Sequence, residues 1–410
     1  MQAITHHRLQ AGSYKLSMAE SKIINHAARV LKLVSAGTPA DQALRESLTQ
    51  DRHFTAPAER RGISRAVFAY FRWLRWLSPK DSPQKQLIAA LDLQARFDKN
   101  PASFKPEALA ARAVPDWLKD EIAWPEVGAV ALNRPAGPAH ADPKAVGGNR
   151  PYPTELAWLR QLQQEPALWI RAKAGTGAAL TGKLSHLIPA PQSPDALRYT
   201  GLTDLYRTKE FQAGEFEIQD LASQLVGLAA APKPGETWWD ACAGEGGKTM
   251  HLSDLMQNKG VLWASDRSGR RLAKLKDRAA RAKVFNFRAA SWEGDEKLPT
   301  KAKFDGVLVD APCSGVGTWQ RNPHSRWTTL PKDVHELAAV QARLLHNVAG
   351  SLKTGGRLVY AVCTLTRAET TAVADTFTAT HQEFEPVAAQ TLWPQDLNAN
   401  GMFIAIWEKR

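Results

Sequence analysis

The chain has 410 residues, more than one hydrophobic core usually serves, so two or three packed domains are expected. Its 53 Lys and Arg outnumber its 41 Asp and Glu, and the formal charge of +12 favours a polyanionic partner such as nucleic acid. Three cysteines, an odd number in a long chain, argue against a disulfide framework and for a reducing compartment. No apolar signal-peptide core and no run of about 18 apolar residues occurs, which excludes a secreted or membrane-spanning class and predicts a cytoplasmic protein.

The N-terminal part of the chain is expected to be helical. From residue 17 to about residue 122 the apolar residues recur at spacings of three and four, the period of amphipathic helices. One segment, ERRGISRAVFAYFRWLRWL, interleaves arginines with aromatic residues. It fits either a solvated face backed by a core stripe, which we favour, or a basic helix that contacts RNA. Residues 125–153 are so rich in Pro, Gly and Ala that they predict a linker or surface insertion.

The C-terminal part predicts an α/β fold. From Thr237 onward short β-rich runs alternate with helical stretches, the pattern of a doubly wound, Rossmann-like, mostly parallel sheet. These runs are TWWDAC, GVLWASD, VFNFRAA, FDGVLVDAP, GRLVYAVCT and MFIAIWEK. Before them, ELAWLRQLQQ predicts a helix and LWIRAKA a strand. The expected domains are residues 1–124 (all-α), 125–153 (linker), 154–235 (a small α/β connecting subdomain) and 236–410 (the doubly wound domain).

A glycine-rich loop follows the first of these strands. In DACAGEGGKT, Gly244, Gly246 and Gly247 let the backbone approach a ligand, and the following helix N-terminus favours an anionic group. A Walker A loop would need glycine where Cys242 stands, and the dinucleotide spacing G-x-G-x-x-G is not met. Two interpretations remain: a structural turn, or a loop for the methionine part of S-adenosylmethionine. Asp266, at the end of the next strand, favours the second because a carboxylate there can take both ribose hydroxyls.

Two cysteines also follow strands, Cys313 in DAPCSG and Cys363 in YAVCT. A buried cysteine is usually a small core residue, but two at one sheet edge beside a cofactor loop favour chemistry. Carbon 5 of cytosine is too poor a nucleophile to attack a methylsulfonium directly, so an enzyme that methylates it first adds a thiolate to carbon 6. A second group must then help remove the carbon 5 proton. Asp310 is placed to hold or protonate the ring nitrogen.

Through these motifs the chain resembles the RsmB/NOL1/NOP2/sun family of RNA cytosine-5 methyltransferases from about Pro151 to its end. The resemblance is carried by GEFEIQDLASQ, DACAGEGGKT, ASDRSGRRL, DAPCSGVGTWQRNP and YAVCT. It implies that Cys363 is the nucleophile, that Cys313 assists proton removal or product release, and that Asp310 binds the base. It also implies that S-adenosyl-L-methionine is held by residues from Cys242, Ala243, Gly244, Glu245, Gly246, Gly247, Lys248, Asp266, Arg271, Ser291 and Asp310. No metal is expected.

The family resemblance has further implications and some departures. Residues 17–122 resemble, more faintly, the NusB-like RNA-binding domain of the RsmB branch, and the family implies ribosomal RNA as substrate, with transfer RNA as the alternative. The sequence is silent on oligomeric state, and we expect a monomer. Ser291 lies near the place of an acidic residue that contacts the adenine amino group in the family. His324 replaces a frequent Asp, and TLTRAET is a degenerate form of the usual segment after the nucleophile.

Two other functions stay open on the sequence alone. One is a catalytically silent RNA-binding assembly factor that kept the fold. The other is an amino-group methyltransferase, in which the fourth strand ends with Pro-Pro and an aromatic residue that stacks on the base. Here DAPCSG offers Cys313 at that place instead.

Overall fold

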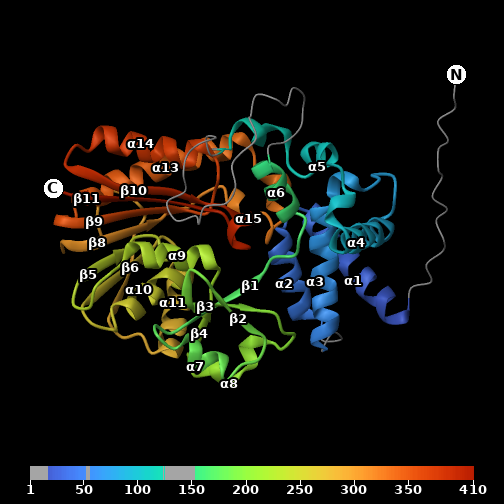
Figure 1. The fold of residues 1–410 in the computed structure, drawn as a ribbon, viewed down its shortest axis with the longest axis horizontal. Helices are drawn as coiled ribbons and strands as arrows, with labels where there is room; N and C mark the ends of the chain where they lie inside the picture. Colours follow the sequence, from blue (N-terminus) through green and yellow to red (C-terminus); the bar gives the residue numbers. More distant parts are fainter. Residues whose placement is uncertain (1–16, 52–55, 123, 125–152) are drawn as a thin grey trace, which may run out of the picture. The chain divides into compact units, whose positions relative to one another are not determined.

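The computed structural model describes residues 17–51, 56–122, 124 and 153–410. The linker predicted at residues 125–153 lies outside this part of the chain, apart from its last residue. The chain divides into two compact units, Met1–Arg96 and Phe97–Arg410 (Figure 1). No helix in the described ranges is long and apolar enough to cross a membrane.

The first unit is helical, as the spacing of its apolar residues predicts. Its helices are α1 (Met18–Ser35), α2 (Ala40–Gln50), α3 (Pro57–Arg72) and α4 (Pro83–Lys99), the last of which continues into the second unit. The segment that alternates arginine and aromatic residues forms α3, and its Ile63, Val67 and Phe71 are buried. Arg72 is buried as well and donates a hydrogen bond to Gln94. This arginine therefore serves the packing of the unit rather than a solvated face.

The second unit begins with a short segment that is tied to the far end of the chain. The segment contains α5 (Pro106–Arg112). Arg326 is fully buried, and its two Nη atoms donate to the backbone carbonyls of Ala113 and Leu162, both at 2.9 Å. Trp124 stacks on Trp393 with the ring centroids 5.3 Å apart. The segment is thus an integral part of the second unit.

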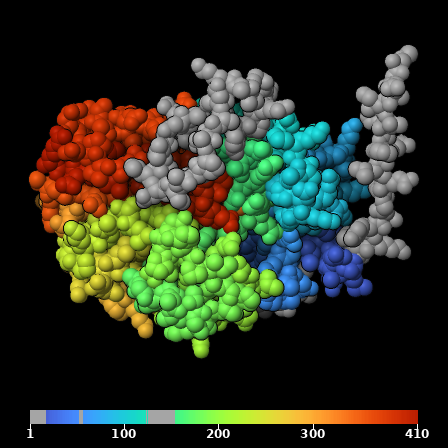
Figure 2. All heavy atoms as spheres, in the orientation of Figure 1, coloured from blue at the N-terminus to red at the C-terminus, as the bar shows by residue number. Residues whose placement is uncertain are grey.

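A small antiparallel sheet comes next. The predicted helix and strand are α6 (Pro153–Gln161) and β1 (Leu168–Ala172). In the order β2-β3-β1-β4 the sheet adds β2 (Leu187–Ala190), β3 (Ser193–Tyr199) and β4 (Phe216–Ile218), with short helices α7 (Gly177–Thr181) and α8 (Lys209–Gln212). Arg171 pairs with Asp254 at 2.8 Å, and Glu217 pairs with Arg278 and Arg281. These ion pairs fix the small sheet to the next domain, and Figure 2 shows the green atoms of the small sheet against the yellow atoms that follow.

The large sheet confirms the predicted α/β fold. Within the described part of the chain it has seven strands in the order β10-β11-β9-β8-β5-β6-β7, and β5 to β9 run parallel. The strands are β5 (Thr237–Asp240), β6 (Val261–Asp266), β7 (Phe287–Ser291), β8 (Phe304–Asp310), β9 (Leu352–Val362), β10 (Phe384–Leu392) and β11 (Met402–Lys409). At the other edge of this sheet, β11 pairs antiparallel with β9 on one side and with β10 on the other.

Helices cover both faces of the large sheet (Figure 1). On one face lie α13 (Pro331–Ala349) and α14 (Thr371–Thr380), and on the other lie α9 (Leu221–Ala230), α10 (Gly247–Leu255) and α11 (Gly269–Ala282). The short α12 (Ser325–Thr328) and α15 (Pro394–Leu397) lie outside these layers. A strand covered on both faces must be apolar on both, which is why β9 reads as the continuous run Leu358 to Val362 and not as an alternation.

The strand order places the site. After β5 the chain moves outward through β6 to β7, whereas after β8 it moves the other way to β9. The carboxyl ends of β5 and β8 therefore border a crevice at the point where the strand order reverses, the usual ligand site of such sheets.

Candidate active site

The glycine loop after β5 leaves open space beside its backbone. Gly244 and Gly246 have φ of +56° and +87°, in the left-handed region that favours glycine. A Cβ at Gly246 would lie 2.6 Å from Cγ of Leu275, so packing also demands glycine there. A Cβ at Gly244 or Gly247 would meet no atom within 4 Å. The loop therefore offers bare backbone, next to the N-terminus of α10, to a ligand.

Asp266 stands beside this loop with a fixed carboxylate. It ends β6 and is 8% exposed. Its Oδ2 accepts the backbone N–H of Gly244 at 3.0 Å, and its Oδ1 accepts that of Ser268 at 2.7 Å. Arg271 Nη1 lies 4.0 Å from Oδ2. Ser291, paired with Asp266 across the ladder between β6 and β7, is exposed at the end of its strand. The structure thus brings together three of the residues predicted to hold the cofactor.

Three other predicted loop residues present little but backbone. Ala243 is buried in the core cluster that contains Leu275. The thiol of Cys242 packs against the core on the other face of the sheet, and burial raises its pKa well above the usual value, so it remains a thiol. Glu245 is exposed and its carboxylate accepts a hydrogen bond from Lys274 at 2.6 Å. Their sequence positions place these residues in the loop, while their side chains serve packing and surface pairing.

Lys248 and Asp310 form a partly buried ion pair across the crevice. Lys248 lies in the first turn of α10, and Asp310 ends β8; Nζ and Oδ2 are 2.7 Å apart. The Lys248 side chain is 9% exposed and that of Asp310 is 30% exposed. Burial lowers the pKa of Lys248, but the charge and hydrogen bond of Asp310 more than offset this, and the pKa is raised. Lys248 is therefore an ammonium group that orients Asp310.

Asp240, at the end of β5, is a buried carboxyl group beside this pair. Burial raises its pKa to about 7, although Thr249 donates a hydrogen bond to its Oδ2 at 2.6 Å. Neighbouring Asp310 also disfavours its ionisation. Near neutral pH this group is present in both the acid and the carboxylate form.

The two predicted catalytic cysteines lie in contact. Cys313 follows β8 and Cys363 follows β9, and their sulfur atoms are 3.3 Å apart. The hydrogen bond from Cys313 lowers the pKa of Cys363, and the positive charges of Lys248 and Arg321 act in the same direction. The same hydrogen bond, together with burial, raises the pKa of Cys313 well above the usual value. The pair therefore favours a thiolate on Cys363 that accepts a hydrogen bond from a Cys313 thiol.

Sequence reasoning missed two residues near the sulfur pair. Arg321, in the loop after β8, contributes positive charge toward Cys363 and toward the half-buried Asp220. Glu369 is fully buried and hydrogen-bonded to the segments that carry both cysteines. The only available signal was their location in RNPHSRW and TLTRAET, two segments that lie next to the recognised motifs.

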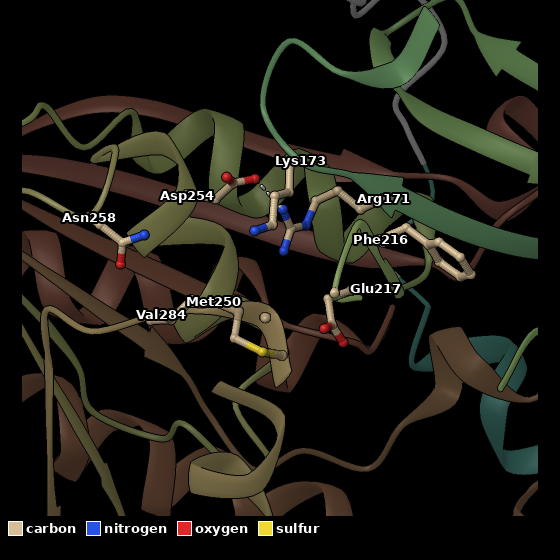
Figure 3. A pocket seen from close by; sticks show the side chains of 10 residues that line it. Arg171, Lys173, Phe216, Glu217, Met250, Asp254, Asn258 and Val284 are labelled. Atoms are coloured by element: carbon tan, nitrogen blue, oxygen red, sulfur yellow. Dashed lines mark hydrogen bonds and ion pairs between the residues drawn. The ribbon is translucent and has the colours of Figure 1, made fainter. Parts of the chain in front are cut away.

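A separate small cavity lies where the small sheet meets α10 and α11 (Figure 3). Its volume is about 30 Å³, and Arg171, Lys173, Glu217 and Asp254 line it together with apolar side chains. That is room for about one water molecule and far too small for a nucleoside cofactor. It is also remote from the carboxyl ends of the parallel strands. We assign it to the packing of the two sheets.

The domain of the large sheet is similar to a family of methyltransferases. Residues 227–408 match the family model described as 16S rRNA methyltransferase RsmB/F. A probable ribosomal RNA small subunit methyltransferase B from Bacillus subtilis is 40% identical over 181 residues, which are 44% of this chain and 40% of that protein. A protein of the same description from Synechocystis is 35% identical over 237 residues, 53% of each chain. The chain thus spans about half the length of the curated relatives it matches.

Solved structures show the same fold. The crystal structure of PH0851 superposes on 97% of this chain with a TM-score of 0.74 at 22% identity, and its own chain is covered completely. A methyltransferase homolog from Pyrococcus horikoshii covers 63% of this chain, with a TM-score of 0.57 at 25% identity, and 91% of its own chain is matched. NSun6 from Pyrococcus horikoshii, crystallised with SFG, covers 62% at 20% identity with a TM-score of 0.56, and 93% of that chain is matched.

Proposed function

We propose that the chain is a member of the RsmB/NOL1/NOP2/sun family and that it methylates carbon 5 of a cytosine in RNA, with S-adenosyl-L-methionine as methyl donor. The observation that carries this proposal is the 3.3 Å contact between Cys313 and Cys363 at the ends of neighbouring parallel strands. Methylation of carbon 5 needs one thiolate and one assisting group, and the pair meets that need. The names of the relatives make ribosomal RNA the proposed substrate, with transfer RNA as the alternative.

The methyl donor fits the glycine loop. The space beside Gly244 and Gly247 would take the methionine part against bare backbone, and Asp266 would accept hydrogen bonds from the ribose hydroxyls. Arg271 and Ser291 border the same side, and Ser291 would stand near the adenine. When bound, S-adenosylmethionine supplies an electrophilic methyl group. NSun6, a protein of the same fold, was crystallised with SFG, an analogue of this donor.

The two cysteines have different roles in the reaction with the base. The Cys363 thiolate adds to carbon 6 of cytosine, a carbon–sulfur bond forms, and the electron pair of the C5–C6 double bond makes carbon 5 nucleophilic. A proton held between Asp310 and the ring nitrogen neutralises the charge that the base gains from the thiolate, and Lys248 orients this carboxyl group. After carbon 5 has gained the methyl group, Cys363 is a thioether and no longer raises the pKa of Cys313. Cys313 then loses its own proton to water and, as a thiolate, accepts the proton of carbon 5. The electrons of that C–H bond restore the double bond, and Cys363 leaves as a thiolate.

A nucleotide inside an RNA helix would have to be flipped out of its stack to reach these sulfurs, and this cost falls for single-stranded or loop residues. We propose that residues 1–124 include a NusB-like RNA-binding domain, for which the net charge of +12 is favourable. We also propose that the protein works as a monomer in the reducing cytoplasm, where Cys242, Cys313 and Cys363 stay free thiols.

The decisive experiment supplies labelled S-adenosylmethionine and RNA that lacks this modification to the wild type and to Cys363→Ala. Mass spectrometry of the nucleosides should show labelled 5-methylcytosine with the wild type only. Calorimetric binding of the cofactor to Cys363→Ala is the control for folding. If the wild type binds the cofactor but labels neither ribosomal nor transfer RNA, the protein is instead a silent RNA-binding assembly factor.

The roles of the two cysteines need a second experiment. Cys313→Ala should accumulate a covalent protein–RNA adduct, because the adduct forms through Cys363 and its release is impaired. Cys363→Ala should form no adduct. Denaturing gel electrophoresis with labelled RNA separates the two cases, and equal adduct from both variants would reverse or refute the assignment.

A further inference from the structure

A fully buried carboxylate lies behind the two reactive cysteines. Glu369 ends a 3₁₀ turn (Arg367–Glu369) between β9 and α14, and its exposed fraction is 0%. Removing a carboxylate from water is costly unless hydrogen bonds replace the lost hydration. No Lys or Arg in the described ranges forms an ion pair with Glu369, so hydrogen bonds from neighbouring side chains and backbone must supply the compensation.

One set of these hydrogen bonds comes from the loop that carries Cys313. Ser314, the next residue, donates its backbone N–H to Oε1 of Glu369 at 2.8 Å and its hydroxyl to Oε2. Gln341 of α13 donates through its Nε2 to the same Oε1 at 3.0 Å and to the carbonyl of Pro312 at 2.9 Å. The residues on both sides of Cys313 are thereby fixed.

The other set comes from the segment that carries Cys363. Thr364, the next residue, donates its hydroxyl to Oε2 of Glu369 at 3.1 Å, and Thr366 donates to the same oxygen at 2.8 Å. The Thr364 hydroxyl also lies 2.9 Å from that of Ser314. One carboxylate therefore joins the residues that directly follow the two cysteines.

We propose that Glu369 is a positioning residue, which ties the Cys313 loop to the Cys363 segment and so holds the two sulfur atoms in contact. The effect on turnover rests on the proposed cytosine methylation, whereas the sulfur geometry does not. The charge of Glu369 has a second effect. It disfavours a thiolate on nearby Cys313, so that the negative charge of the sulfur pair resides on Cys363. A neutral side chain of the same shape would lose this bias.

The test is alkylation of the folded protein by iodoacetamide between pH 6 and 9, with each cysteine quantified by peptide mass spectrometry. In the wild type, Cys363 should react ahead of Cys313. In Glu369→Gln, which keeps the shape and loses the charge, the preference for Cys363 should fall by about tenfold, the equivalent of one pKa unit. Ser314→Ala removes one hydroxyl, with its contacts to Glu369 and Thr364, and keeps the charge of Glu369, so it should lower the preference by a smaller factor. This variant is the test if Glu369→Gln does not fold.

A second measurement reports geometry directly. The azo reagent diamide oxidises two adjacent thiols to a disulfide and is itself reduced to the hydrazine, so the yield depends on the approach of the two sulfurs. Disulfide formation between Cys313 and Cys363 should slow in Glu369→Gln. The matched control is Glu217→Gln, which removes another buried carboxylate, one that pairs with Arg278 and Arg281. It should lower thermal stability without changing either thiol measurement.

Three results would overturn the proposal: a wild-type alkylation preference in folded Glu369→Gln, no change in Ser314→Ala, or the same loss in Glu217→Gln. Neither assay uses RNA or a cofactor. Failure of the methylation experiment therefore leaves this proposal standing, and failure of the thiol assays leaves the proposed reaction standing.

Discussion

Replacing Lys248 by methionine would leave the carboxylate of Asp310 in the crevice without its partner. Breaking a buried ion pair costs about 3–5 kcal/mol, because the remaining charge is uncompensated. The Asp310 side chain keeps 30% of its surface exposed, so solvent screening reduces the expected loss in the free energy of unfolding to about 2–3 kcal/mol. Asp310→Asn should cost a similar amount, since it strands the Lys248 ammonium. The double variant should lose no more than either single variant, because no charge is left unpaired.

The coupling energy between the two positions follows from a double-mutant cycle in urea, with no cofactor or RNA present, and should be about 2 kcal/mol. The matched control is Lys353 and Asp305, whose Nζ–Oδ1 distance is also 2.7 Å but whose side chains are 45% and 30% exposed. The cycle Lys353→Met and Asp305→Asn should give less than about 1 kcal/mol. If the two cycles give equal coupling energies, burial does not strengthen the pair and the reasoning is refuted.

Three further predictions concern the same crevice. Because burial raises the folded-state pKa of Asp240 to about 7, the contribution of its neutral form to stability is complete below about pH 4 and is lost as the pH rises through 7. In urea titrations Asp240→Asn should flatten this pH dependence of the free energy of unfolding and stabilise the protein at pH 8, and an unchanged pH dependence would contradict the argument. Gly246→Ala places a Cβ at φ +87° and 2.6 Å from a leucine side chain and should lower stability by about 1–3 kcal/mol, whereas Gly247→Ala, whose Cβ meets open space, should cost under about 1 kcal/mol. Equal shifts in the melting temperatures of the two variants would refute the steric argument. Cys313→Ala removes the hydrogen bond that lowers the pKa of Cys363, so alkylation of Cys363 at pH 7 should slow. Mass spectrometry can follow this rate, and an unchanged rate would refute the role of the hydrogen bond.

The sequence predicts the large sheet and its reactive edge well, for a geometric reason. In a parallel sheet the strands end at a common edge, so Asp240, Asp266, Asp310 and Cys363, each at or just after the end of an apolar run, had to lie near one another. Helical spacing likewise predicts the first unit, because apolar residues must recur every three or four positions to bury one side of a helix. The catalytic and cofactor-binding roles of these residues remain predictions.

Other features could not be predicted because they depend on contacts between distant segments. In the small antiparallel sheet β1 is apolar and was predicted, whereas β2 and β3 contain Pro189 and Pro194, which weaken the strand pattern. Cys242 is no different from the other cysteines in sequence, and only its packing against the core sets it apart. Glu369 accepts its hydrogen bonds from three segments that are separate in the sequence, and no one of these segments indicates that the others lie nearby.

The buried guanidinium of Arg326 limits how the polypeptide can be dissected. Its hydrogen bonds end on the carbonyls of Ala113 and Leu162, one before and one after residues 125–152. A shortened polypeptide that starts at residue 154 would lack the first carbonyl and leave a buried donor unpaired, at a cost of about 1–3 kcal/mol. A single protease cut between residues 125 and 152 removes neither contact. The two fragments should therefore elute together in gel filtration, because the hydrogen bonds of Arg326 and the stacking of Trp124 on Trp393 still join them.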